Sequence, residues 1–173
     1  TDWYYDAISY AVEKELFNGV SETEFAPNNK MTRGMLVTVL YRMSKDREKE
    51  NSTFTDVSEE VYYSVPISWA YKNQIVNGVG DNHFAPDQEI SREDLATIMA
   101  RYIKLKEISL KNQKGKDTEF ADELSISDYA KENVKILQKK GLMNGKGENL
   151  FDPKGKTTRA EVATILMRLM ESM

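Results

Sequence analysis

The chain has 173 residues, 40% of them hydrophobic, which is enough for a folded core within one domain. Its 24 basic and 28 acidic residues give a net charge of −4, which disfavours nucleic acid as the main partner. Zero cysteines exclude disulfides, zinc thiolate sites and thiol catalysis. No apolar run approaches the roughly 18 residues of a membrane span, and the N-terminus lacks the layout of a signal peptide. We expect a soluble globular protein without membrane insertion, and any export signal must lie outside this fragment.

One stretch of the sequence occurs three times. In each copy five residues separate Gly from Phe, one separates Phe from Pro, and five separate Pro from Arg. A match at five fixed positions arises by chance about once in a few million starts, so the chain is a threefold internal repeat. The copies are Asn18, Gly19, Phe25, Pro27 and Arg33; Asn77, Gly78, Phe84, Pro86 and Arg92; and Asn144, Gly145, Phe151, Pro153 and Arg159.

The first repeat predicts a helix, an ordered loop and a second helix. Apolar residues recur at helical spacing from Trp3 to Leu16, which indicates an amphipathic helix of about four turns. This helix should end at Asn18-Gly19, because Gly and Asn accept the left-handed conformation that closes a helix. Thr32 is the expected N-cap of the second helix, whose apolar face is Leu36, Val37, Leu40 and Met43.

The second and third repeats add a motif before their first helices. Phe54-Thr55-Asp56 lies before Tyr62, the counterpart of Trp3, and Phe120-Ala121-Asp122 lies before Tyr129. The first-repeat copy would precede Thr1, so we expect the fragment to begin inside a repeat. The second helices start at Ser91-Arg92-Glu93-Asp94 and at Thr158-Arg159-Ala160-Glu161, the latter a full capping box.

Two charged segments separate the repeats. The resulting division is repeat 1 at residues 1–44, N-terminally incomplete; a linker at 45–53; repeat 2 at 54–104; a linker at 105–119; and repeat 3 at 120–173. The fold class is all-α. One helix pair cannot bury both of its apolar stripes, so the three repeats must pack on one another, either as a closed pseudo-threefold cluster or as an open stack.

These motifs together resemble the S-layer homology (SLH) domain family. Its pattern is Phe-x-Asp, an aromatic residue that is usually Trp, a helix ending in Gly, Phe-x-Pro, and then Thr-Arg-Ala-Glu. Residues 158–161 match the last motif in full, whereas residues 91–94 and 32–35 depart from it. The resemblance covers nearly the whole chain apart from the linkers.

The resemblance implies three tandem repeats in one compact, three-pronged, pseudo-threefold domain. It also implies binding of secondary cell-wall polysaccharide that bears pyruvate ketals on N-acetylmannosamine. The function expected is non-covalent anchoring of an exported protein to the bacterial cell wall, in the S-layer or at the cell surface. We further expect a monomeric pseudo-trimer with the first helices of the repeats clustered at its centre.

An arginine directly follows the N-cap of each second helix, at the positive end of the dipole, where a cation is unfavourable by about 0.3–1 kcal/mol. One interpretation is that Arg33, Arg92 and Arg159 form receptors for a carboxylate together with free amides of the helix end. The other is that each pairs with an acid of its own domain, such as Asp56 or Asp122. The resemblance favours the binding interpretation.

Two further sets of equivalent residues belong to the predicted ligand-binding site. Aromatic residues at the starts of the first helices can stack on a sugar ring, or instead cap the core. Glycines at the ends of these helices are predicted helix stops, and the resemblance implies that they border the ligand. The aromatic residues are Trp3, Tyr62 and Tyr129, and the glycines are Gly19, Gly78 and Gly145.

Two other classes of function compete with a carbohydrate-binding anchor. A helical-repeat scaffold for proteins ranks second, although such arrays use shorter periods and lack the Phe-x-Pro loop. A cell-wall glycoside hydrolase ranks third, because no carboxylate pair stands out from the repeat pattern. We therefore predict no enzymatic activity, no catalytic residues, no metal and no cofactor.

Overall fold

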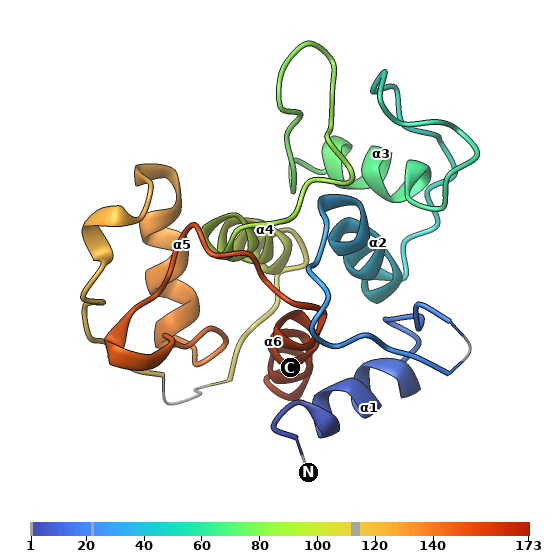
Figure 1. Cartoon of the computed structure of the whole chain (residues 1–173). Helices are drawn as coiled ribbons and strands as arrows, with labels where there is room; N and C mark the ends of the chain where they lie inside the picture. The colour runs from blue at the N-terminus through green and yellow to red at the C-terminus, as the bar shows by residue number, and fades with distance from the viewer. Residues whose placement is uncertain (1, 22, 112–114) are drawn as a thin grey trace.

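A computed structural model describes residues 2–21, 23–111 and 115–173, in which helices are joined by long loops (Figure 1). Within these ranges the β-structure is limited to isolated bridges, so the all-α prediction is confirmed. No helix in the described part of the chain is long and apolar enough to cross a bilayer. The helices are α1 (Tyr5–Glu13), α2 (Arg33–Ser44), α3 (Ser64–Lys72), α4 (Arg92–Leu105), α5 (Asp128–Lys139) and α6 (Arg159–Glu171), with 3-10 turns η1 (Glu123–Ser125) and η2 (Gly147–Asn149).

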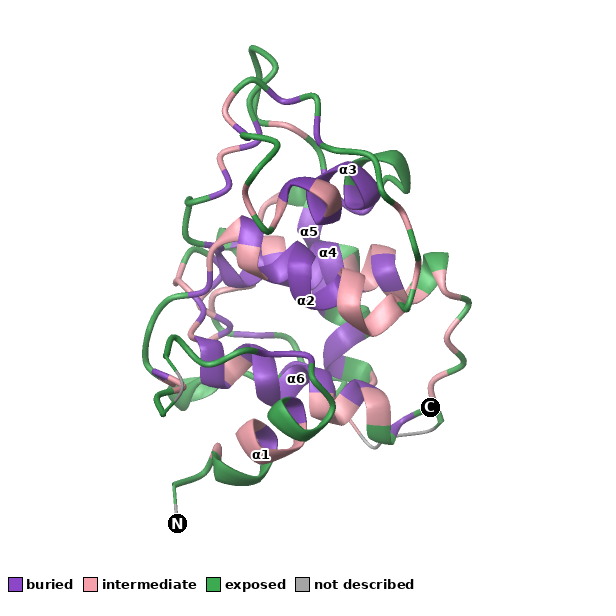
Figure 2. Ribbon diagram, turned by 90° about the vertical axis from the view of Figure 1, so that its right-hand side faces the viewer, coloured by how far each residue is buried: buried purple, intermediate pink, exposed green. Residues whose placement is uncertain are grey.

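The second helices of the repeats, α2, α4 and α6, form the centre of the molecule (Figure 1). Helices α1, α3 and α5 lie outside them, and each forms one of three prongs together with the second helix on which it packs. The prediction that the first helices cluster centrally is therefore wrong. Five consecutive residues of each second helix are buried, at 36–40, 95–99 and 162–166. Five residues exceed one helical turn, so these helices are covered on all sides, as the buried segments in Figure 2 show.

Each prong combines two repeats rather than one. Helix α2 packs on α3, α4 packs on α5, and α6 returns to pack on α1. The second helix of every repeat thus covers the first helix of the next one. Because the last repeat closes on the first, the arrangement is a ring and not an open stack.

Three main-chain hydrogen bonds close this ring at its centre. The Met31 amide donates to the Thr157 carbonyl at 2.9 Å, Ile90 donates to Met31 at 2.9 Å, and Thr157 donates to Ile90 at 3.1 Å. All three residues are buried. Each repeat therefore donates one bond and accepts one, which is the pattern of a pseudo-threefold axis.

The predicted caps of the second helices are present. The hydroxyl oxygens of Thr32, Ser91 and Thr158 accept hydrogen bonds from amides three residues later, at 3.3, 3.2 and 3.2 Å. The Glu161 carboxylate accepts a hydrogen bond from the Thr158 amide at 2.7 Å, which completes the predicted capping box.

The first helices end earlier than predicted. Helix α1 ends at Glu13, well short of Gly19, and the chain takes a left-handed turn at Glu15, where φ is 56°. Gln74 and Gly141 occupy the same place in the other repeats, with φ of 57° and 69°. The predicted role of Gly19 and its equivalents as helix stops is therefore wrong, since other residues make the turn.

The first linker joins two prongs. The Asp46 carboxylate accepts hydrogen bonds from Trp69 Nε1 at 2.7 Å and from Lys106 Nζ at 2.6 Å. Trp69 is 2% exposed, so it packs in the core as its mid-helix position suggests. Residues 112–114 of the predicted second linker lie outside the described part of the chain, as do residues 1 and 22.

Candidate functional site

Each predicted arginine reaches across to the loop of the next repeat. Arg33 donates from Nε to the Phe84 carbonyl at 3.0 Å and from Nη2 to the Asn77 carbonyl at 2.7 Å. Its guanidinium carbon lies 4.5 Å from the centre of the Phe84 ring. Arg92 makes the same bonds to Phe151 (2.7 Å) and Asn144 (2.8 Å), and Arg159 makes them to Phe25 (2.9 Å) and Asn18 (2.7 Å).

The amides at the starts of the second helices are not free, contrary to expectation. The Arg33 amide donates to the Gln88 carbonyl at 3.0 Å, and the Gly34 amide donates to the Pro86 carbonyl at 2.8 Å. The corresponding amides of α4 and α6 donate to loop carbonyls in the same way. An incoming carboxylate would therefore meet arginine side chains here, and not a cluster of open amides.

Asp56 and Asp122 do not line the grooves and instead fix loops of their own repeats. Asp56 accepts from the amides of Phe84 (2.8 Å) and Ala85 (2.7 Å), and Asp122 accepts from those of Phe151 and Asp152, both at 2.8 Å. Burial alone would raise the pKa of Asp56, but these backbone bonds lower it below the usual value. Neither aspartate forms a direct ion pair with Arg33 or Arg92, although the charges of both act to raise the pKa of these arginines. The acid that does pair with an arginine is Glu161, whose carboxylate lies 3.5 Å from Nη1 of Arg92.

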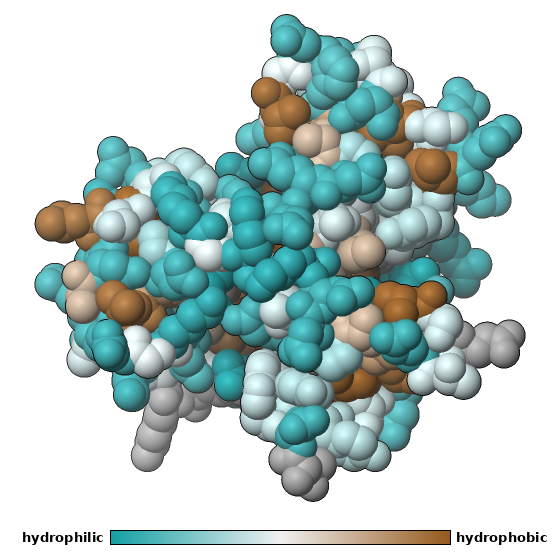
Figure 3. All heavy atoms as spheres, viewed as in Figure 1, coloured by the Kyte–Doolittle hydropathy of each residue, from teal (hydrophilic) through white to brown (hydrophobic). Residues whose placement is uncertain are grey.

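Three equivalent grooves run between the prongs, and the recesses are visible on the face in Figure 3. We number each groove by the repeat that supplies its Asn-Gly pair. Groove 1 has a volume of about 510 Å³, groove 2 about 280 Å³ and groove 3 about 150 Å³. The defining residues are Asn18, Gly19, Met35, Thr38, Arg42, Tyr62 and Arg159 in groove 1; Asn77, Gly78, Asp94, Thr97, Arg101, Tyr129 and Arg33 in groove 2; and Asn144, Gly145, Glu161, Thr164, Arg168, Trp3 and Arg92 in groove 3.

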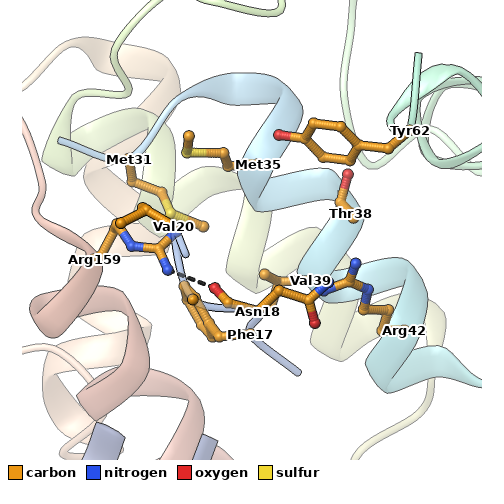
Figure 4. Close-up of a pocket in the computed structure, with 11 residues that line it drawn as sticks. Phe17, Asn18, Val20, Met31, Met35, Thr38, Val39, Arg42, Tyr62 and Arg159 are labelled. Atoms are coloured by element: carbon orange, nitrogen blue, oxygen red, sulfur yellow. Dashed lines mark hydrogen bonds between the residues drawn. The ribbon is translucent and has the colours of Figure 1, made fainter. Parts of the chain in front are cut away.

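Every groove draws on all three repeats. In groove 1 the wall comes from repeat 1, Arg159 comes from repeat 3, and Tyr62 comes from repeat 2 (Figure 4). The aromatic residues are open to solvent, with Trp3 67%, Tyr62 60% and Tyr129 54% exposed. The structure thus brings nine of the eleven predicted site residues into grooves and leaves the two aspartates outside.

The glycines are required by close packing of the loop. A Cβ on Gly19 would lie 2.4 Å from the Ser21 carbonyl oxygen. On Gly78 it would lie 2.7 Å from the Phe54 ring, and on Gly145 it would lie 2.8 Å from the Phe120 ring. No side chain fits there, so the groove wall is bare backbone.

Sequence reasoning missed a second arginine in each groove. Arg42, Arg101 and Arg168 each follow the first arginine of their own repeat by nine residues, and this constant spacing was the available signal. Each donates from Nη1 to a carbonyl in the turn after the first helix, at 3.3, 3.4 and 3.3 Å. A threonine five residues after the first arginine is equally constant, and its hydroxyl bonds back to the helix.

The grooves differ at the third residue of the second helix. Asp94 in groove 2 accepts from the Tyr129 hydroxyl at 2.8 Å and from the Ser91 hydroxyl at 2.7 Å. Glu161 in groove 3 lies 3.5 Å from Nη1 of Arg92. Groove 1 has Met35 at this position, which carries no charge.

Neighbouring groups act against burial on the pKa values of the three first arginines. Burial lowers the pKa of all three first arginines. At Arg33 the opposing groups are Asp94 and then Asp56, and at Arg92 they are Glu161 and then Asp152 and Asp122. At Arg159 the opposing group is the Tyr62 phenol.

The fold and grooves define a class of protein: a closed three-repeat helical module that presents paired arginines and an exposed aromatic ring at each junction. The chain belongs to the S-layer homology domain family, whose profile matches residues 1–34, 53–96 and 119–163. The three matched segments confirm the tandem repeats inferred from the spacing. This family is a binding and anchoring module, and it places the chain outside the cell, at the bacterial cell surface.

The chain is similar to parts of several larger proteins. It is 33% identical to Exoglucanase XynX of Acetivibrio thermocellus over 98% of this chain and 16% of that protein. It is 31% identical to the Surface-layer 125 kDa protein of Lysinibacillus sphaericus over 95% of this chain and 14% of that protein. The Cellulosome-anchoring protein of Acetivibrio thermocellus matches 85% of this chain at 24% identity and 33% of its own length. The chain spans less than a fifth of the first two of these relatives.

Proposed function

We propose that the chain anchors an exported bacterial protein to the cell wall without a covalent bond, by binding pyruvylated secondary cell-wall polysaccharide in the grooves between repeats. The observation that carries the proposal is the repeated juxtaposition of two arginines and one exposed aromatic ring in each groove. A guanidinium pairs well with the carboxylate of a pyruvate ketal, and an aromatic face stacks on a sugar ring.

The relatives agree with an anchoring role. A surface-layer protein and a cellulosome-anchoring protein share this region, and so do enzymes of which it forms a small part. A module shared by proteins of such different names fits attachment to a common surface better than catalysis. We propose that the cargo attached to this chain is anchored in the same way.

The groove architecture also favours polysaccharide over a protein partner. The face in Figure 3 is mainly hydrophilic, with its apolar residues in separate patches. A groove that receives an amphipathic helix of a protein partner is hydrophobic along its length. Separate recesses with a ring and cations suit individual sugar units of a polymer.

The direct test is co-sedimentation of the chain with purified cell-wall sacculi. We expect the chain to pellet with intact sacculi, and to remain in the supernatant once the secondary polymer is stripped or the pyruvate is removed. Pelleting that survives removal of the secondary polymer contradicts the proposal. Pelleting lost with the polymer but not with the pyruvate preserves the anchoring role and contradicts the role of the ketal.

A further inference from the structure

The three grooves are built on one plan but differ in charge at one position. Met35, Asp94 and Glu161 are equivalent third residues of α2, α4 and α6, and each lines its groove. Two of the three are acids. An anionic ligand would therefore meet a negative charge at this position in grooves 2 and 3 but not in groove 1.

The acids act where the ligand carboxylate would bind. Glu161 already lies 3.5 Å from Nη1 of Arg92, the terminal nitrogen that is not used to hold the loop. Asp94 lines groove 2 with Arg33 and accepts a hydrogen bond from the Tyr129 hydroxyl at 2.8 Å, so it links the aromatic residue of that groove to the start of α4. A like charge placed next to an incoming carboxylate opposes binding.

Groove 1 lacks this obstacle. Its described lining residues include Arg159 and Arg42 but no Asp or Glu (Figure 4). Met35 instead joins Val20 and Val39 to give the groove an apolar side, and its volume of about 510 Å³ is the largest of the three. Cations on some walls and apolar groups on others suit a carboxylate carried on a small apolar body, which describes a ketal-linked pyruvate.

We infer that the third residue of each second helix determines whether its groove accepts a carboxylate, and that groove 1, which contains Met35, is the principal binding site. This inference rests on the proposed function and adds the ranking of the grooves. The departure of residues 32–35 from the Thr-Arg-Ala-Glu pattern thus favours carboxylate binding in groove 1. Without an acid at position 35, Arg159 has no acidic lining residue beside it that competes with the ligand carboxylate. The site of strongest binding lies at the junction of repeats 3, 1 and 2.

The test is calorimetric titration of the whole chain with soluble fragments of pyruvylated polymer. For the wild type we expect one strong site per chain. Met35→Glu introduces the acid of the other grooves, and Met35→Gln has the same length without the charge. Like-charge repulsion should make the Glu variant bind roughly tenfold more weakly than the Gln variant. Asn51→Glu adds the same charge at an exposed linker position and should leave affinity unchanged.

The reverse exchange tests the inference independently. Asp94→Asn removes the charge of groove 2 and keeps an oxygen that can accept from Tyr129, so we expect a second site to appear. Equal affinity of the Glu and Gln variants at position 35, with binding that still depends on pyruvate, overturns the ranking and leaves the proposed function intact. If Met35→Glu fails to fold by circular dichroism, absence of a second site in Asp94→Asn overturns the ranking instead. No binding by the wild type overturns both proposals.

Discussion

The Arg159 guanidinium donates a 2.7 Å hydrogen bond to the main-chain carbonyl oxygen of Asn18, across 141 residues of sequence, and so joins the last helix to the first loop. Its Nε donates to the Phe25 carbonyl oxygen at 2.9 Å, and its guanidinium carbon lies 4.6 Å from the centre of the Phe25 ring. The side chain therefore holds repeat 3 to repeat 1 and also lines groove 1. Experiments on these arginines must separate the two roles.

Arg159→Ala should lower the free energy of unfolding by roughly 2–4 kcal/mol, because two partly buried hydrogen bonds lose their charged donor. Arg159→Lys should recover little, since an ammonium cannot reproduce the planar fork. Urea denaturation followed by circular dichroism measures both. Arg47→Ala, at an exposed linker position, is the control and should change stability by less than about 0.5 kcal/mol. An Arg159→Ala variant as stable as this control would show that the two hydrogen bonds of Arg159 contribute nothing to stability.

The hydrogen bonds to the loop of the next repeat also bear on which of the three arginines is held most firmly. From the sequence, Gly34 and Met35 weaken the cap of α2, which predicts that Arg33 is held less firmly than Arg92 and Arg159. The structure gives Arg33 the same pair of bonds, at 3.0 and 2.7 Å, as Arg159 has at 2.9 and 2.7 Å. The next repeat's loop holds each arginine, so the quality of its own cap has little influence.

The sequence alone was sufficient for the repeats, the fold class and the helix caps. Spacing marked Gly19, Arg33 and Tyr62 as candidate site residues because they recur in every repeat, but it could not pair them across repeats. Their partners are main-chain carbonyls, which carry no residue-type signal. The sequence signal for the central position of α2 is the run Leu-Val-Thr-Val-Leu at 36–40, which is wider than the apolar stripe of an amphipathic helix and is fully buried in the structure.

Removal of the third repeat should abolish cooperative unfolding of the other two. A chain ending at residue 110 loses the loop that Arg92 holds, the α5 cover of α4 and the α6 cover of α1. Calorimetry of this fragment should show no sharp transition. Adding residues 115–173 in trans should restore a transition if the ring reassembles. A sharp transition of the shorter fragment alone would mean that ring closure is dispensable.

Gly145→Ala should destabilise the chain by about 1–3 kcal/mol, since overpacking forces backbone or ring shifts. The new Cβ would lie 2.8 Å from the Phe120 ring and 2.9 Å from the Leu150 carbonyl oxygen. Gly147→Ala is a matched control two residues away, where a Cβ meets nothing within 4 Å. Thermal melts of the two variants should separate clearly. Equal melting temperatures would refute the close-packing explanation for the repeated glycine.

Acid should destabilise the chain partly through Glu93, which is 3% exposed. Burial alone would raise its pKa, but bonds from Lys154, Ser127 and Tyr129 lower it below the usual value. A carboxyl group with a lowered folded-state pKa stabilises above its unfolded pKa, about 4.3 for Glu, and loses this contribution as the pH falls through the folded value.

The urea midpoint should therefore stay nearly constant between about pH 7 and 5 and fall below about pH 4. In Glu93→Gln the midpoint should be lower at neutral pH and the acid-induced fall shallower. Glu13→Gln, at an exposed position on α1, controls for the loss of a carboxylate. An unchanged slope in Glu93→Gln would remove Glu93 from this explanation.

Tyr62→Ala should weaken wall binding while leaving the melting temperature within about 1–2 °C of the wild type, because a ring that is 60% exposed contributes little to the core. Tyr5→Ala, at a residue 59% exposed on α1 and outside the groove linings, is the comparison and should bind normally. Sedimentation with sacculi and a thermal melt on the same samples distinguish a contact from a folding defect. Equal binding by the two variants would argue against stacking.

The ring of hydrogen bonds among Met31, Ile90 and Thr157 also limits how such modules can be multiplied. Each of the three residues gives one bond and takes one, so the circuit is complete when the third copy is reached. A head-to-tail interface that closes at a fixed rotation has a set membership, unlike a solenoid that lengthens by one unit at a time. A fourth copy spliced into the chain would find every donor and acceptor on the axis already engaged. It would stay outside the closed ring, and two further copies would be needed for it to form a second ring of three.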